Sequence, residues 1–189
     1  MELDRETPGN RLRQEKRGED SMRKTLGYLI IPTLLLCTSA IAAPVDEAHL
    51  PPKTFADASE IQKLITQAAK DHEPGTFSSQ YIAALAPYHV NLEYRTTATP
   101  PAVHLKEAEL IYVISGSGTL TVGGTLENSR PGKPGNLGGT ATKGGADELL
   151  EPGTFVFVPE GQPHWFSNVK AGNPLVTMAF HVPRPLRPS

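Results

Sequence analysis

The sequence predicts an all-β domain with one helix packed outside it. From residue 77 onward, hydrophobic residues fall in short alternating segments that turns rich in glycine and proline separate, a pattern typical of strands. The chain has 17 glycines and 18 prolines but few aromatic residues, a composition that favours many turns over a helical bundle. Its 189 residues suffice for one domain with a single core. The number of short segments indicates a closed barrel or a two-sheet sandwich.

The amino-terminal residues are expected to lie outside this fold. Residues 1–21 are mostly charged or polar and cannot bury an apolar face, so we interpret them as a disordered upstream extension and Met22 as the true start. Residues 22–42 have the basic beginning, apolar middle and small-residue ending of a secretory signal peptide. Cleavage near Ala42 would yield an exported protein, periplasmic or secreted, without a stable membrane anchor.

One alternative is that this segment stays in place as a membrane anchor. Residues 26–43 carry no charge and are just long enough to span a bilayer. Pro32 and the cleavage-like ending favour the signal peptide.

Cysteine content and charge exclude several classes of function. Cys37 is the only cysteine and lies in the predicted signal peptide, so the mature chain can have no disulfide, thiolate metal site or cysteine nucleophile. The 18 basic and 20 acidic residues nearly balance, which gives no basic footprint for nucleic acid.

Residues 43–76 are predicted to form an arm and one helix. Over residues 57–71 the apolar positions recur at helical spacing on one face, and Ser59 with Gln62 can form a capping box. We expect this helix to pack against a sheet, and it shows no chemistry of its own.

Residues 77–183 are predicted to form the barrel, followed by a tail over residues 184–189. Apolar residues 155–158 predict a buried core strand. Residues 127–147 are rich in glycine and predict a loop that builds no packed element. The strand-forming segments are expected within residues 77–85, 88–96, 109–124, 148–169 and 175–185.

Three side chains of metal-ligand type lie on strands that otherwise consist of core residues: His104, Glu109 and His164. Alternation along a strand places Glu109 on the same face as Ile111, and His164 on the same face as Phe166. A buried carboxylate is costly unless it is paired or binds a metal. Two imidazoles and one carboxylate form a ligand set suited to Fe(II), Mn(II), Ni(II) or Zn(II).

The segment GTFVFVPEGQPHWFSN, residues 153–168, resembles the second signature motif of the cupin superfamily. It matches that motif at every fixed position, which are Gly153, Pro159, Gly161, His164 and Asn168.

The first cupin motif is matched with one departure. His104 fills its second histidine position, and Glu109 and Gly116 also fit, but Ala102 stands where the first histidine is expected. The resemblance covers residues 88–182.

The resemblance implies a jelly-roll β-barrel that binds one divalent transition metal (Fe, Mn, Ni or Zn) through His104, Glu109 and His164. It also implies a homodimer and a small-molecule substrate. Metal-binding cupins usually offer three histidines and one glutamate, so this set leaves coordination positions open. One expectation is a metal-dependent oxygenase, isomerase or lyase. The alternative is a non-catalytic small-molecule-binding cupin with a degenerate site, in which His104 and Glu109 form a plain hydrogen-bonded pair.

Five further residues are candidates for the lining of a substrate pocket. Two of them, His89 and His181, could also replace the missing ligand. His89 alternates with Asn91, Glu93 and Arg95, a polar set expected to face solvent or to line the mouth of the pocket. The five candidates are His89, Tyr94, Ile111, Phe166 and His181.

Overall fold

The computed structural model describes residues 50–184. The predicted extension and signal peptide (residues 1–42) and nearly all of the predicted tail lie outside the described residues. Within residues 50–184, no helix is both long enough and apolar enough to cross a membrane.

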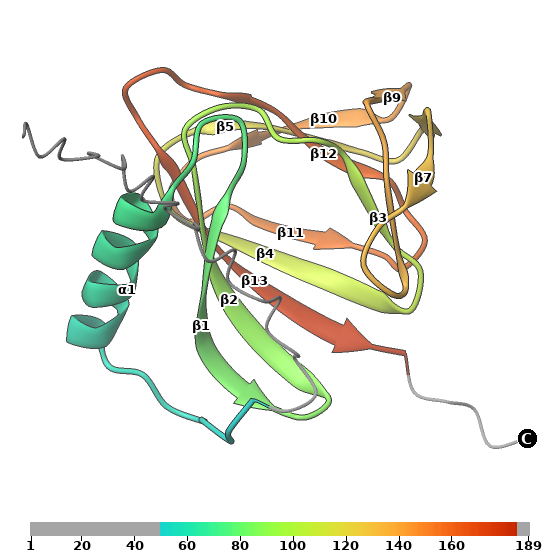
Figure 1. The fold of residues 1–189 in the computed structure, drawn as a ribbon. Coiled ribbons are helices and arrows are strands. Elements are labelled where there is room, and N and C mark those ends of the chain that lie inside the picture. The colour runs from blue at the N-terminus through green and yellow to red at the C-terminus, as the bar shows by residue number, and fades with distance from the viewer. Residues whose placement is uncertain (1–49, 185–189) are drawn as a thin grey trace, which may run out of the picture. The chain divides into compact units, whose positions relative to one another are not determined.

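Thirteen antiparallel strands in the described part of the chain form two large sheets and a short ribbon (Figure 1). The first sheet has the order β1 (Ser78–Leu85), β2 (Tyr88–Arg95), β13 (Leu175–Pro183), β4 (Glu107–Ser115) and β11 (Phe155–Val158). The second has the order β10 (Ala146–Leu150), β5 (Gly118–Val122), β12 (His164–Val169), β3 (Ala102–His104), β8 (Asn136–Gly138) and β7 (Arg130–Pro131). The ribbon pairs β6 (Thr125–Glu127) with β9 (Ala141–Lys143).

The two large sheets enclose the main hydrophobic core. Ile111 and Val113 of β4 are fully buried and pack with Leu120 of β5, Phe166 of β12 and Leu175 of β13. Each of these residues occupies the inward position of an alternating strand, as the period of two requires. The fold is therefore an all-β jelly-roll barrel, as predicted.

The turn between β4 and β5 depends on a glycine. Gly116 has a φ of +83°, and a Cβ atom there would lie 2.0 Å from the carbonyl oxygen of Pro174. Only a residue without a side chain fits both the backbone conformation and this close approach.

The one helix, α1 (Ala58–Asp71), packs on the outside of the first sheet (Figure 1). Its fully buried Ala68 lies in a second apolar cluster with Ile82 of β1, Leu92 of β2 and Val176 of β13. Apolar residues from the same face of the helix join this cluster, namely Ile61, Leu64 and Ile65. The prediction of one helix outside the barrel is confirmed.

The predicted capping box of Ser59 and Gln62 is wrong. The helix begins at Ala58, and the carboxylate of Asp57 accepts a hydrogen bond from the backbone N–H of Glu60 at 2.8 Å. Asp57 therefore caps the helix, and the hydroxyl of Ser59 donates to the same carboxylate at 2.8 Å.

The glycine-rich segment 127–147 is more ordered than its composition predicts. It contains β7, β8 and β9, and β8 pairs with β3 so that Asn136 lies opposite His104. Pairing with the distant strand β3 anchors β8, while β7 pairs with β8 and β9 pairs with β6. Local composition does not report such pairing. The prediction of a loop without packed elements is wrong here.

Strand β11 is also less buried than its sequence predicts. It lies at the edge of the first sheet, where Val158 is 2% exposed but Phe155 and Phe157 are 57% and 55% exposed. The two phenylalanines occupy the outward positions of the strand, and α1 covers the other end of that sheet. The expectation of a fully buried core strand is therefore wrong for half of its residues.

Candidate metal centre

Three strands bring His104, Glu109 and His164 together; we call these residues the triad. His104 is the last residue of β3, Glu109 lies in β4 of the facing sheet, and His164 is the first residue of β12. The turn before β12 is tied to β3 by a hydrogen bond of 2.7 Å from the backbone N–H of Gly161 to the carbonyl oxygen of His104. Gly161 has a φ of +73°, which glycine adopts without strain.

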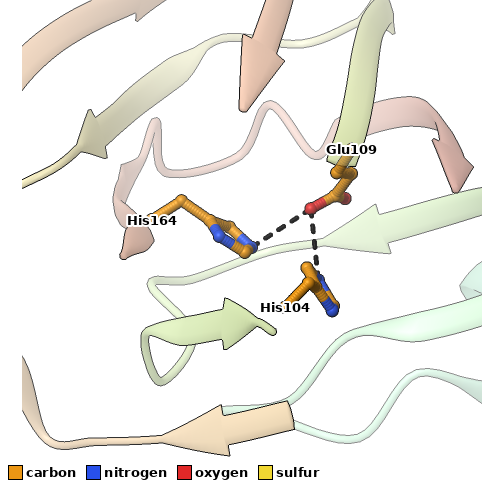
Figure 2. Close-up of side chains that lie close together, drawn as sticks. All are labelled: His104, Glu109 and His164. Carbon is orange, nitrogen blue, oxygen red and sulfur yellow. Dashed lines mark ion pairs between the residues drawn. The ribbon is translucent and has the colours of Figure 1, made fainter. Parts of the chain in front are cut away.

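The two imidazoles of the triad approach the same carboxylate oxygen (Figure 2). The Nε2 atom of His164 lies 3.1 Å from Glu109 Oε2, and the Nε2 atom of His104 lies 3.4 Å from it. Although these contacts are short, Oε2 is buried and no donor meets it with hydrogen-bond geometry. An acceptor of this kind fits a cation placed between the three side chains better than it fits a simple hydrogen-bonded pair.

Glu109 and His104 influence each other's protonation. Burial favours the neutral acid, but the charge of His164 and the polar contact with His104 outweigh burial and hold the pKa of Glu109 well below its usual range. Burial likewise opposes a charged His104, but the polar contact with Glu109 and the charge of that carboxylate prevail and raise the pKa of His104 to about 9. Without a metal, the triad is therefore an ionised carboxylate beside a protonated imidazole.

The donor set of the triad fits a divalent transition metal. Its three ligand atoms all lie within 4.8 Å of one another, and two imidazoles with one carboxylate leave further coordination positions for water or substrate. Metal binding would displace the proton of His104, because a ligand nitrogen must be unprotonated.

Ala102 lies beside the triad. It is the register partner of His164 between β3 and β12, and it is half-buried. It also lies on the same face of β3 as His104, two residues away. A histidine at this position would therefore project toward the triad, whereas alanine offers no donor.

Four of the five pocket candidates line the interior near the triad, and one does not. Ile111 and Phe166 are buried in the core, His181 lies opposite Glu109 across β13 and β4, and His89 stacks on His181. Tyr94 occupies the opposite face of β2, where it packs with α1 and against the ring of His72. The period of two separates Tyr94 from His89, so Tyr94 lies outside the interior.

The sequence matches the model of a known protein family. The sequence profile of the family described as "Cupin" matches residues 57–185, which is more than half of the chain. The chain belongs to the cupin family. Among curated proteins, none is significantly similar to it in sequence.

Many solved structures resemble the fold of this cupin. They include TT1209 from Thermus thermophilus (18% identity, TM-score 0.45, covering 69% of this chain and 98% of that one). BH2720 from Bacillus halodurans has 16% identity and a TM-score of 0.47, covering 72% of this chain and 86% of that one. The Fe(II) form of HppE has 18% identity and a TM-score of 0.41, covering 56% of this chain and 50% of that one. Identities this low say nothing about shared activity.

The polar set on β2 of this cupin is buried and does not face solvent. His89, Asn91, Glu93 and Arg95 are each exposed by 9% or less. Glu93 forms an ion pair of 2.8 Å with Arg95, and the guanidinium of Arg95 lies 3.7 Å from the centroid of the Phe166 ring. These four residues share one face of β2, as the alternation predicts, and this face points into the barrel because the opposite face of β2 packs against α1.

Sequence reasoning missed two residues that contact His104. The Oδ1 atom of Asn136 lies 3.1 Å from His104 Nδ1, and Oε1 of Glu107 lies 3.4 Å from the same nitrogen. Glu107 has a detectable signal, since it alternates with Glu109 along β4. Asn136 has none, because it reaches the site only through the pairing of β8 with β3.

Proposed function

We propose that this cupin is a metal-dependent enzyme that acts on a small organic substrate, with a divalent transition metal held by His104, Glu109 and His164. The observation that carries the proposal is the buried Glu109 Oε2, which two imidazole nitrogens approach at 3.1 and 3.4 Å without hydrogen-bond geometry. A bound divalent ion would supply Lewis acidity or, as iron, O₂ activation. Oxygenase, isomerase and lyase reactions can each use such chemistry.

The surrounding residues suit this role. Ile111 and Phe166 provide an apolar wall beside the triad, which limits the water that competes with a substrate for open coordination positions. At the ring nitrogen of His104 that does not face Glu109, Asn136 accepts a hydrogen bond from Nδ1 when that nitrogen is protonated. This contact leaves Nε2 facing Glu109 and available as the ligand atom.

Metal analysis tests the proposal. Protein purified without a metal-affinity tag should contain about one transition metal ion per chain, and Glu109→Gln or His164→Gln should remove it. Glu148→Gln, a matched change on the exposed strand β10, should retain it. If the wild-type protein binds no ion after incubation with iron, manganese, nickel and zinc in turn, the proposal is wrong.

The alternative is a cupin that binds a small molecule without turnover. Ala102 favours it, because the position beside His164 supplies no fourth ligand. Screening the metal-loaded protein against a small-molecule library separates the two. An enzyme consumes a compound only when metal is present, whereas a binding protein is stabilised by a compound that it returns unchanged.

We also propose that this protein is exported. The support is the tripartite pattern of residues 22–42. Mass spectrometry of the mature protein, recovered outside the cytoplasm, should place its first residue near Ala43. An intact amino terminus on the mature protein would contradict export by cleavage.

A further inference from the structure

A second cluster of ligand-type side chains surrounds the other nitrogen of His104. While Nε2 of His104 faces Glu109, its Nδ1 lies 3.4 Å from Oε1 of Glu107. The same Glu107 oxygen lies 3.0 Å from Nδ1 of His181. His104, Glu107 and His181, which we call the outer cluster, offer ligand atoms that all lie within 4.8 Å of one another.

The barrel framework fixes the position of the outer cluster. Glu107 and Glu109 share one face of β4 and are separated by two residues, which is about 7 Å along a strand. His181 of β13 lies opposite Glu109 of β4 on one side and opposite His89 of β2 on the other. The ring of His104 lies between the two carboxylates, so each of its nitrogens faces a different one.

The interior holds more imidazoles than one metal ion requires. His89 stacks on His181 at 4.5 Å between ring centroids, His181 meets His104 at 5.2 Å, and His104 meets His164 at 5.1 Å. Four of the six histidines in the chain thus form a continuous row next to two glutamates. Histidine is the commonest metal ligand in proteins, and the triad uses only two of these four.

We propose that the outer cluster is a second divalent-cation site, formed by Glu107, His181 and the Nδ1 atom of His104. The inference builds on the proposed function of the triad, whose ion is the inner one. The outer cluster repeats the composition of two imidazoles and one carboxylate that suits Zn(II), Fe(II), Ni(II) or Cu(II). It is also more accessible, since the side chains of Glu107 and Glu109 are 22% and 3% exposed.

Sharing His104 has a chemical consequence. When both ions are bound, each ring nitrogen donates its lone pair to one ion, so the proton on Nδ1 leaves to solvent and His104 bridges the ions as an imidazolate. Binding at Nδ1 would also replace the contact of this nitrogen with Asn136 Oδ1, which lies 3.1 Å away. For both reasons the outer ion binds more weakly than the inner ion and fills after it.

Zinc stoichiometry in the intact protein tests the second site. Calorimetric titration of the metal-free chain with Zn²⁺ should show a tight first ion and a weaker second ion. Glu107→Gln and His181→Gln should each lose the second ion and keep the first. Glu109→Gln should lose the tight ion and keep the weak one, while Glu148→Gln, on exposed β10, should keep both. Circular dichroism confirms that each variant is folded. Glu107→Gln and His181→Gln should give the same result, because both remove a ligand of the outer cluster.

A spectroscopic measurement tests the bridge. Two Cu²⁺ ions joined by one imidazolate couple magnetically. The electron paramagnetic resonance signal per copper should therefore fall when the second Cu²⁺ ion binds. In Glu107→Gln the signal per copper should stay constant.

Two results would overturn the second site. One is a wild-type protein that takes up a single Zn²⁺ at saturation. The other is a Glu107→Gln variant that still takes up two ions. If Glu107→Gln only weakens a single ion, Glu107 orients His104 and holds no cation, and the proposed function of the triad still stands. If the tight ion is missing and Glu109→Gln changes nothing, the proposed function fails as well.

Discussion

At the scale of single residues, Ala102 determines how many ligands the triad has. It is the register partner of His164 and lies two residues from His104 on the same strand. The backbone of β3 therefore already presents this position to the triad. The alanine side chain is a methyl group, which has no atom that can bind a metal ion.

Ala102→His should tighten metal binding by about tenfold or more, which corresponds to about 1.4 kcal/mol. The added imidazole completes a set of three histidines and one glutamate on a framework that is already in place. Competition with a chelator of known affinity measures the change for Zn²⁺. Ala108→His is the matched control, because Ala108 lies next to Glu109 on the opposite face of β4, and it should leave the affinity unchanged. Equal affinities for Ala102→His and the wild type would show that position 102 does not reach the metal.

At the scale of elements, β2 carries a buried ion pair on the face that points into the barrel. Glu93 and Arg95 form a 2.8 Å pair in which both side chains are less than 10% exposed. The guanidinium of Arg95 lies over the ring of Phe166 at 3.7 Å and over that of Phe77 at 4.6 Å. The pair therefore joins β2 to β12 of the facing sheet through an aromatic contact.

Removing one member of this pair should cost more stability than removing both. Glu93→Leu leaves a buried guanidinium without its counter-charge, which typically lowers the free energy of unfolding by about 3–5 kcal/mol. Glu93→Leu combined with Arg95→Met removes both charges and should recover much of that loss. Urea unfolding of the metal-free protein at one pH compares the variants. If the double variant is less stable than Glu93→Leu alone, the packing of Arg95 against Phe166 matters more than the charge.

The elements also show which parts of the site the sequence predicts. Alternation places Glu109, His164 and Phe166 inside the barrel because a strand has a period of two, which holds wherever the strand exists. The same rule fails to choose the side of β2 that faces inward, because packing of α1 decides it. Asn136 could not be predicted, since only long-range pairing of a glycine-rich segment brings it to His104.

At the scale of the whole molecule, the homodimer implied by family resemblance stays a prediction. Phe155 and Phe157 of β11 and Tyr112 of β4 are 57%, 55% and 37% exposed, and Phe155 lies opposite Tyr112. An exposed aromatic patch of this kind often marks a protein interface. Light scattering after size exclusion should give the mass of two chains for the wild type and of one chain for Phe155→Lys combined with Phe157→Lys. A monomeric wild type would contradict the prediction.

The stability of the metal-free protein should fall as the pH rises from neutral to alkaline values. In the folded state the pKa of His104 is about 9, against an ordinary value of 6.5. A raised pKa means that folding favours the protonated imidazole, so its contribution is complete below about pH 6.5 and is lost as the pH rises through about 9. The pKa of His181 is also raised, so His181 contributes in the same direction: burial lowers its pKa, but the hydrogen bond with Glu107 and the charges of nearby carboxylates together raise it by more.

The stability contributed by the carboxylates of Glu107 and Glu109 depends on pH in the opposite sense. A hydrogen bond from His181 lowers the pKa of Glu107, and the charge of His164 lowers that of Glu109 against its burial. Their contribution is present above their ordinary pKa of 4.5 and is lost as the pH falls. Stability should therefore be highest between about pH 4.5 and 6.5 and should decline by up to about 3 kcal/mol by pH 9.

Urea unfolding in the presence of a chelator, repeated across this pH range, measures the decline. His104→Gln removes the titrating imidazole and should flatten the alkaline part of the profile, whereas His72→Gln, outside the barrel interior, should leave its shape unchanged. A wild-type profile that is flat between about pH 6.5 and 9 would mean that folding does not favour the protonated form of His104. The affinity of the triad for a metal ion should change in the opposite sense and increase with pH up to about 9, because this ion must displace the proton of His104 that stabilises the metal-free barrel.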